Sequence, residues 1–396
     1  MRILTADAIF PVSGPPVFNG YLVISDEGEV VELRPKLETD AGNIESFKGI
    51  LVPGFINTHC HLDLSHLRGE IAPGWGLDAF IRDIKNQNPI NFSEEAKTEA
   101  SRLAENEMIE NGIVGVGDIA SYEHSLAVKE QGRLSWYSFC EAFGSDPADA
   151  NLRFEKALEL FKKIKALPGQ AGVSLAPHAT YSVSPELFNL IKDWAEENGG
   201  PISIHHQENN DENQYFQKKG GPIVSRMFDF HVNIRSVHPR RMRPLPAILP
   251  NLPTNNPIIL VHNTVSTPED IHFAMDNLKD PWWCLCPNAN LYIENCIPNL
   301  PFFRPFGDKI TLGTDSLASN HQLSILSEMK TLQQFYPDVE TSELIQWATQ
   351  NGAKLLGMDS WAGSFDVGKK PGVNLIKGIV PDSLKLLPES KIQVIA

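Results

Sequence analysis

Histidines and acidic residues recur at the ends of short apolar runs in this 396-residue chain. The residues at these positions that can bind a metal or move a proton are His59, His61, Asp118, Glu141, His178, His205, His262 and Asp315. A lone histidine at such a position is usually a polar residue with an ordinary hydrogen-bond partner. A series of them at successive strand ends predicts a metal centre with acid–base groups around it.

His59 and His61 have the clearest spacing. Residues two apart on a strand point to the same side, so both imidazoles face one way and Cys60 faces the other. Two imidazoles this close can chelate a zinc-like ion. Cys284 and Cys286 have the same spacing. A Cys-x-Cys without a second pair, however, favours core packing over a metal site.

Eight apolar runs alternate with helical patterns between residues 54 and 362. We predict strands over 54–59, 114–118, 134–141, 172–178, 201–205, 257–262, 282–287 and 309–315. Helical patterns cover 93–111, 152–166, 184–198, 267–278 and 341–356. The first and third of these open with a serine suited to an N-cap. Strands alternating with helices in this number predict an α/β protein with a (β/α)8 TIM barrel, whose strand ends converge on the face that carries active sites.

Both ends of the chain have a different pattern, with short strands separated by turn residues. Tyr21-Leu-Val-Ile-Ser and Val30-Val-Glu-Leu flank a turn near the N-terminus, and the same style returns after Gly363. We therefore predict a small β-sandwich domain built from residues 1–53 and 363–396. Residues 54–362 would form the barrel domain.

Composition excludes several classes of protein. Hydrophobic residues make up 42% and charged residues 21% of the chain, which is typical of a folded globular protein. With 34 Lys and Arg against 49 Asp and Glu, the net charge of −15 disfavours nucleic acid as a partner. No apolar run approaches the roughly 20 residues that span a bilayer, and the N-terminus makes a poor signal peptide. Five cysteines do not form a disulfide framework, so we expect a cytoplasmic protein without a membrane segment.

Four sequence blocks, in this order, resemble the amidohydrolase superfamily. They are Pro53-Gly-Phe-Ile-Asn-Thr-His-Cys-His, His205-His-Gln-Glu208, His262 after Ile-Ile-Leu-Val, and Leu312-Gly-Thr-Asp-Ser-Leu-Ala-Ser-Asn320. Within the superfamily they are similar to the mononuclear branch, which includes cytosine, guanine and S-adenosylhomocysteine deaminases and triazine chlorohydrolases. The resemblance covers essentially the whole chain.

This resemblance implies a site with one divalent metal ion. Zn²⁺ is the preferred ion, and Fe²⁺ is the alternative. The implied ligands are His59, His61, His205 and Asp315. The fourth strand ends Ser174-Leu-Ala-Pro-His, without the carbamylated lysine of binuclear members, and this favours a single metal.

The groups of this branch suit hydrolytic deamination. A divalent metal lowers the pKa of bound water enough to give hydroxide near neutral pH. Asp315 would take the water proton, and His262 would orient the hydroxide. Glu208 would act as general acid toward a ring nitrogen of an amidine substrate.

Two loops narrow the substrate to an adenine nucleoside. Ala176-Pro-His-Ala-Thr-Tyr-Ser-Val-Ser184 resembles the fourth-strand loop of adenosine-type deaminases, which implies that His178 meets the ribose or the ring. His61-Leu-Asp-Leu-Ser-His-Leu-Arg-Gly69 and the aromatic segment after it are similar to the aminodeoxyfutalosine deaminases of the alternative menaquinone pathway. The positions that carry this likeness are Asp63, Ser65, Trp75 and Phe80.

The substrate of those deaminases, 6-aminodeoxyfutalosine, carries a benzoate, so an arginine should meet its carboxylate. Arg68 is one candidate. The other is the stretch 226–243, which a solvated loop or a subunit contact also explains; its arginines are Arg226, Arg235, Arg240, Arg241 and Arg243. The residues after the seventh strand that would line the pocket are Asn288, Asn290 and Tyr292.

Other functions stay open at this point. Within the same fold, the chain could deaminate S-adenosylhomocysteine, methylthioadenosine, adenosine or another purine or pyrimidine, or remove chloride from a triazine or cleave an amide. A non-catalytic relative would have lost ligands, and none is lost here. A sugar-phosphate barrel enzyme would need a Gly-rich phosphate loop after the last two strands, and neither loop supplies one. The expected partner is a small nucleoside or N-heterocycle, and the resemblance allows a homodimer.

Overall fold

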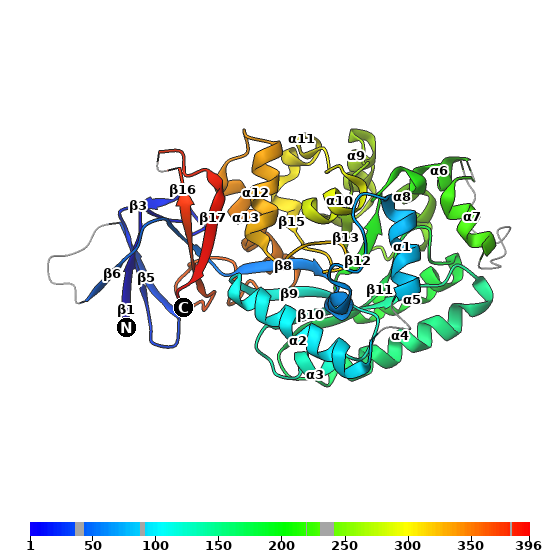
Figure 1. The fold of residues 1–396 in the computed structure, drawn as a ribbon, viewed down its shortest axis with the longest axis horizontal. Coiled ribbons are helices and arrows are strands. Elements are labelled where there is room, and N and C mark those ends of the chain that lie inside the picture. The colour runs from blue at the N-terminus through cyan, green and yellow to red at the C-terminus, as the bar shows by residue number, and fades with distance from the viewer. Residues whose placement is uncertain (36–42, 88–91, 219, 230–240, 381) are drawn as a thin grey trace.

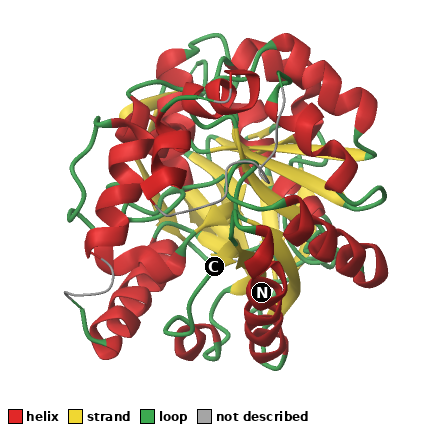
Figure 2. Cartoon of the chain, turned by 90° about the vertical axis from the view of Figure 1, so that its right-hand side faces the viewer, coloured by secondary structure: helices red, strands yellow, loops and turns green. Residues whose placement is uncertain are grey.

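The computed structural model describes residues 1–35, 43–87, 92–218, 220–229, 241–380 and 382–396. The strands of the two chain ends lie at one side of an elongated body, and a larger assembly of parallel strands and helices forms the other side (Figure 1). Figure 2 shows the helices arranged around the strands of this larger assembly.

Eight parallel strands form two four-stranded sheets. The first sheet has the order β11-β10-β9-β8 and consists of β8 (Phe55–Cys60), β9 (Ile113–Ala120), β10 (Ser135–Ala142) and β11 (Gln170–Pro177). The second has the order β12-β13-β14-β15 and consists of β12 (Ile202–His206), β13 (Pro257–His262), β14 (Asp280–Leu285) and β15 (Ile310–Leu312). All eight predicted strands are present, with the seventh two residues earlier and the eighth limited to three residues.

Backbone hydrogen bonds join the edge strands of the two sheets at two seams, one between β11 and β12 and one between β15 and β8. The His205 amide donates to the His178 carbonyl over 2.9 Å, which links the end of β11 to β12. The Asp315 amide donates to the His59 carbonyl over 3.0 Å, which links the residues after β15 to β8. Both seams therefore meet at residues expected in the active site.

Helices connect and cover the strands. The longer ones are α1 (Gly76–Gln87), α2 (Glu94–Glu110), α4 (Ala150–Lys165), α5 (Pro185–Asn198), α6 (Asn210–Lys218), α7 (Pro222–Asp229), α9 (Pro268–Asn277), α10 (Pro287–Glu294), α12 (Ile325–Phe335) and α13 (Thr341–Ala348). The short ones are η1 (Leu62–Leu67), α3 (Leu126–Lys129), η2 (Pro147–Asp149), α8 (Pro244–Ile248), η4 (Leu249–Asn251), α11 (Leu300–Phe303), η5 (Arg304–Lys309) and α14 (Gln350–Leu355). Within the described ranges, every helix is too short or too polar to span a lipid bilayer.

Local signals explain where several helices begin. Ser93 and Ser184 accept hydrogen bonds from the Ala96 and Leu187 amides, which confirms both predicted N-caps. The single helix predicted over 341–356 is wrong, because the chain leaves helical geometry at Thr349, with φ −133° and ψ −84°, and divides into α13 and α14.

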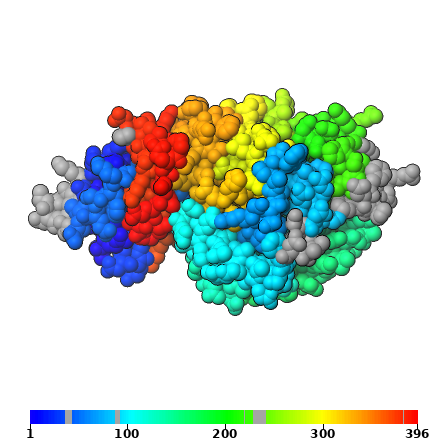
Figure 3. Space-filling view, in the orientation of Figure 1, coloured from blue at the N-terminus to red at the C-terminus, as the bar shows by residue number. Residues whose placement is uncertain are grey.

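The first and last segments of the chain form two further sheets, and the second of these contains strands from both segments. One sheet has the order β5-β4-β1-β6 and consists of β1 (Arg2–Thr5), β4 (Tyr21–Ile24), β5 (Val30–Arg34) and β6 (Ile44–Ser46). The other has the order β17-β16-β7-β2-β3 and consists of β2 (Ala8–Ile9), β3 (Val17–Phe18), β7 (Ile50–Pro53), β16 (Val373–Ile379) and β17 (Leu386–Val394). Because β16 pairs antiparallel with β7, the end of the chain packs beside its beginning (Figure 3).

Candidate active site

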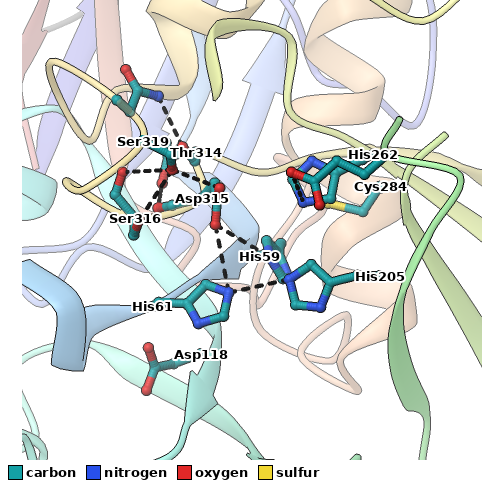
Figure 4. A network of polar contacts seen from close by, with 12 residues as sticks. His59, His61, Asp118, His205, His262, Cys284, Thr314, Asp315, Ser316 and Ser319 are labelled. Atoms are coloured by element: carbon teal, nitrogen blue, oxygen red, sulfur yellow. Dashed lines mark hydrogen bonds and ion pairs between the residues drawn. The ribbon is translucent and has the colours of Figure 1, made fainter. Parts of the chain in front are cut away.

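The four predicted metal ligands converge in one buried cluster. His61 Nε2 lies 3.3 Å from His205 Nε2 and 3.5 Å from Asp315 Oδ1. His59 Nε2 lies 3.5 Å from the same carboxylate oxygen (Figure 4). All four side chains are buried, so the cluster draws on β8, β12 and the residues after β15.

An irregularity in β8 helps to aim the two histidines of that strand. The register of β8 with β9 shifts between Asn57 and Cys60, as in a β-bulge. As a result Ile56 and His59 point to the same side of β8 although they are three residues apart. Ile56 packs there against the side chains that the parallel strands turn toward one another, and His59 joins the histidine cluster. Cys60 points to the opposite side of the strand, as the spacing predicts, and packs in the core between the strands and the covering helices.

Neighbouring groups hold the cluster in a geometry that suits a cation. His205 Nδ1 lies 2.7 Å from the His178 carbonyl, so it donates there and leaves the Nε2 lone pair facing His61. Ser319 donates to Asp315 Oδ2 over 2.6 Å, so Oδ1 is the oxygen facing the imidazoles. Both nitrogens of His59 are buried and make no hydrogen bond of normal length to a described residue.

These residues fit one divalent ion. Ligands at roughly 2.1 Å from a tetrahedral ion lie about 3.4 Å from one another, close to the separations in the cluster. Three imidazoles and one carboxylate are ligands that both Zn²⁺ and Fe²⁺ accept.

Glu208 and His262 lie beside the cluster. His262 Nε2 is 3.8 Å from Glu208 Oε1, and His262 Nδ1 is 3.1 Å from Asn290 Nδ2 on α10. Burial, reinforced by the carboxylates of Asp315 and Glu294, raises the pKa of Glu208 well above its ordinary value. Burial lowers the pKa of His262 to about 3, so this imidazole is neutral at physiological pH. The site therefore holds a carboxyl group able to carry a proton and a neutral imidazole able to donate a hydrogen bond.

His178 and Glu141 form the opposite flank of the site. The His178 ring lies 4.9 Å from the His205 ring, and His178 Nδ1 is 2.6 Å from Ser182 Oγ. Ligand atoms of Glu141, His178 and His205 all lie within 4.8 Å of one another. Ser121 donates to Glu141 Oε2 over 2.6 Å.

Comparisons with known proteins agree with this geometry. The family model described as Amidohydrolase family matches residues 50–395. The chain belongs to the amidohydrolase family. It is 27% identical over 378 residues to the aminodeoxyfutalosine deaminase of Deinococcus radiodurans, covering 90% of this chain and 86% of that one. It is 26% identical over 360 residues to the 5-methylthioadenosine/S-adenosylhomocysteine deaminase of Natronomonas pharaonis, covering 88% and 77%.

A solved structure supports the fold of this amidohydrolase. The crystal structure of Helicobacter pylori aminofutalosine deaminase in complex with methylthio-coformycin matches with a TM-score of 0.78 at 20% identity, covering 98% of this chain and 94% of that chain. The resemblance to the superfamily, and within it to aminodeoxyfutalosine deaminases, is confirmed.

Of four further predicted substrate residues of the amidohydrolase chain, three have other partners and the fourth is exposed. Arg68 forms an ion pair with Glu107 of α2, and its side chain is 48% exposed. Ser65 donates to the Leu62 carbonyl within η1. Trp75 is 76% exposed. The Asn288 amide group donates to two side chains of α12, Ser327 and Glu328. None of these contacts among described residues joins the four to the metal cluster, so their substrate roles stay predictions.

The basic stretch 226–243 is only partly described. Arg226 pairs with Asp78 of α1, and Arg243 pairs with Asp270 of α9. The Arg241 amide donates to a backbone carbonyl. Arg235 and Arg240 lie outside the described residues. Of the other residues expected to line the pocket, Tyr292 donates to the Ile71 carbonyl, and Asn290 contacts His262.

Sequence reasoning missed Arg153 on α4. Its Nε is buried and has no hydrogen-bond partner among the described residues, and Asp149 lies 3.7 Å from its terminal nitrogen. The guanidinium carbon lies 5.7 Å from the centre of the Phe143 ring, which in turn is 6.3 Å from the His178 ring. Gly144 leaves room for it, since a Cβ there would lie 2.9 Å from Arg153 Cγ. The signal available in the sequence was a lone arginine shortly after the third strand.

Proposed function

We propose that this amidohydrolase is a metal-dependent hydrolytic deaminase of adenine nucleosides, with 6-aminodeoxyfutalosine as the best substrate. The observation that carries the proposal is Glu208, a buried carboxyl group with a raised pKa beside His262 and the metal cluster. Deamination of an amidine carbon requires such a group, because the ring nitrogen must be protonated as water adds. The relatives named for deaminases of adenine nucleosides support the same reaction.

The ligands His59, His61, His205 and Asp315 would hold one divalent ion, with Zn²⁺ preferred. When bound, such an ion lowers the pKa of a water molecule to near neutral.

The residues around the cluster divide the remaining chemistry. Asp315 accepts the proton of the attacking water, and Ser319, which donates to its Oδ2, holds the carboxylate in position. The Asn290 amide donates to His262 Nδ1, which places the remaining ring proton on Nε2. His262 Nε2 can then donate a hydrogen bond to the attacking oxygen and fix its approach.

Glu208 supplies a proton to the ring nitrogen next to the amino-bearing carbon. As the oxygen bonds to that carbon, the electron pair of the C=N bond moves to this nitrogen and takes the proton. The C–N bond to the amino group then breaks. Ammonia leaves with the proton that Asp315 took from the water. Glu208 takes the proton of the new hydroxyl group, so the ring keeps the oxygen as a carbonyl and both carboxyl groups return to their starting states.

A carboxylate on the substrate would be met by Arg153. Its buried Nε lacks a hydrogen-bond partner among the described residues, and its ion pair with Asp149 is long, at 3.7 Å. Arg68, Arg226 and Arg243 each have a carboxylate partner at closer range. The exposed Phe143 ring between Arg153 and His178 suits an aromatic group beside that carboxylate. Together these groups favour an aryl carboxylate attached to the nucleoside.

We also propose that the eight parallel strands close into one (β/α)8 barrel, because backbone hydrogen bonds join the two sheets at both seams. Residues 1–53 and 363–396 would form the β-sandwich domain. The homodimer and the cytoplasmic location also stay predictions.

Ammonia release tests the proposal. The panel contains 6-aminodeoxyfutalosine, S-adenosylhomocysteine, methylthioadenosine, adenosine, guanine and cytosine, each with zinc-loaded protein and with Asp315→Asn as the blank. We expect turnover to be fastest with 6-aminodeoxyfutalosine and absent in the blank. Fastest turnover of another adenine nucleoside would change the substrate but keep the reaction. Release of chloride from a triazine without any ammonia from the panel would overturn the deaminase.

A further inference from the structure

Glu141 has a carboxylate oxygen that the proposed reaction does not use. Its Oε1 is buried and has no hydrogen-bond partner among the described residues. Its Oε2 is held by the Ser121 hydroxyl over 2.6 Å, which fixes the carboxylate at the end of β10. A buried acceptor in a ligand-binding site is costly unless a donor meets it, so this oxygen points to a ligand.

Glu141 lies on the binding side of the site rather than the reactive side. The groups assigned to proton transfer are Glu208, which follows β12, His262, which ends β13, and Asp315, which follows β15. Glu141 lies on β10 and His178 directly follows β11, two strands of the other sheet. Ligand atoms of both residues lie within 4.8 Å of a ring nitrogen of His205. Phe143, two residues further, continues this flank toward the exposed rim. A nucleoside with its reacting carbon at the metal would extend its sugar along this flank.

A second metal ion fits this flank less well. His205 donates through Nδ1 to a backbone carbonyl, and its Nε2 faces the first metal cluster. Only Glu141 and His178 would remain as protein ligands, fewer than structural or catalytic sites usually provide. A carboxylate beside an imidazole instead suits the hydroxyl donors of a sugar.

We infer that Glu141 accepts a hydrogen bond from a ribose hydroxyl of the nucleoside and so selects ribonucleosides over deoxynucleosides. The inference rests on the proposed function, since it requires an adenine nucleoside as substrate. Ser121 acts as a positioning residue because it holds the other carboxylate oxygen.

Competition measurements test this inference. Adenosine, 2′-deoxyadenosine and 3′-deoxyadenosine serve as competitors of whichever nucleoside the wild-type protein deaminates fastest. We expect wild type to bind adenosine about 10- to 100-fold more tightly than one of the two deoxynucleosides, the range of a hydrogen bond to a charged acceptor. In Glu141→Gln this preference should fall to about threefold or less. Glu123→Gln, an exposed carboxylate on the neighbouring loop that pairs with Lys163, should keep it.

The outcomes distinguish a failure of this inference from a failure of the proposed deaminase function. If wild type deaminates no adenine nucleoside, the proposed function fails. If wild type is active but Glu141→Gln keeps the wild-type preference, or weakens all three competitors equally, the role of Glu141 is overturned. Two zinc ions per wild-type chain and one in Glu141→Gln would also overturn it in favour of a second metal. Ser121→Ala should reduce the preference partially, and this variant replaces Glu141→Gln as the test if the latter does not fold.

Discussion

At the scale of single residues, the protonation state of Glu208 controls the proposed reaction. Burial favours the neutral acid, so the pKa of Glu208 is raised and the group can donate a proton near neutral pH. We expect kcat/KM to be high where Glu208 is protonated and to fall as the pH rises through its raised pKa. Glu208→Gln should lower kcat by about 10²- to 10⁴-fold and remove this alkaline decline. An unchanged pH profile in Glu208→Gln, with zinc content preserved, would contradict the assignment.

Arg153 is the residue that should decide which nucleoside binds best. Arg153→Met removes a guanidinium from beside Phe143, so KM for 6-aminodeoxyfutalosine should rise about 10- to 100-fold while KM for methylthioadenosine changes little. Steady-state kinetics with both substrates give the comparison. Arg102→Met, an exposed arginine that pairs with Glu99 on α2, is the matched control. Equal losses for the two substrates would show that Arg153 stabilises the fold instead.

At the scale of elements, a buried ion pair holds the segment that follows the metal-binding strand. Lys129 Nζ of α3 lies 2.6 Å from Asp118 Oδ2 of β9, and both side chains are fully buried. The other oxygen of Asp118 accepts the Leu62 amide, directly after His61. Lys129 also donates to Ser138 on β10, so one cation joins α3, β9 and β10.

Removing one partner of this ion pair should lower the free energy of unfolding more than removing both partners. Lys129→Met leaves the Asp118 carboxylate buried without its cation, and we expect the free energy of unfolding to fall by about 3–5 kcal/mol. The double variant Asp118→Asn with Lys129→Met removes both charges and should recover part of that loss. Urea unfolding of the three proteins measures it. A loss below about 1 kcal/mol in Lys129→Met would indicate that water reaches the pair.

At the scale of the whole molecule, the metal ligands come from both parallel sheets. His59 and His61 belong to the first sheet region, His205 to the second, and Asp315 follows its last strand. Binding of one ion should therefore stabilise the folded chain by about 2.7 kcal/mol at a free metal concentration 100 times Kd.

Metal removal tests this linkage. We expect chelation to lower Tm and abolish activity, and zinc to restore both. His61→Ala should bind zinc weakly and show little zinc-dependent change in Tm. A Tm that does not change while zinc content falls from one per chain to none would contradict the idea that the ion joins the two sheets.

The sequence by itself determined the positions that carry chemistry. Apolar runs ending in His59, His61, His178, His205 and His262 predicted the strands and their functional ends, because side-chain alternation and the strand–helix rhythm are local properties. The N-caps at Ser93 and Ser184 were predictable for the same reason.

Only the tertiary structure decided which polar groups are already satisfied. Arg68 and Arg153 look equivalent in the sequence. Arg68 pairs with Glu107, which is 39 residues away along the chain. The buried Nε of Arg153 has no hydrogen-bond partner among the described residues. Glu141 and His178 likewise become one flank only because β10 and β11 pair in parallel. Satisfaction of a buried polar group depends on partners distant in sequence, and folding alone brings those partners together.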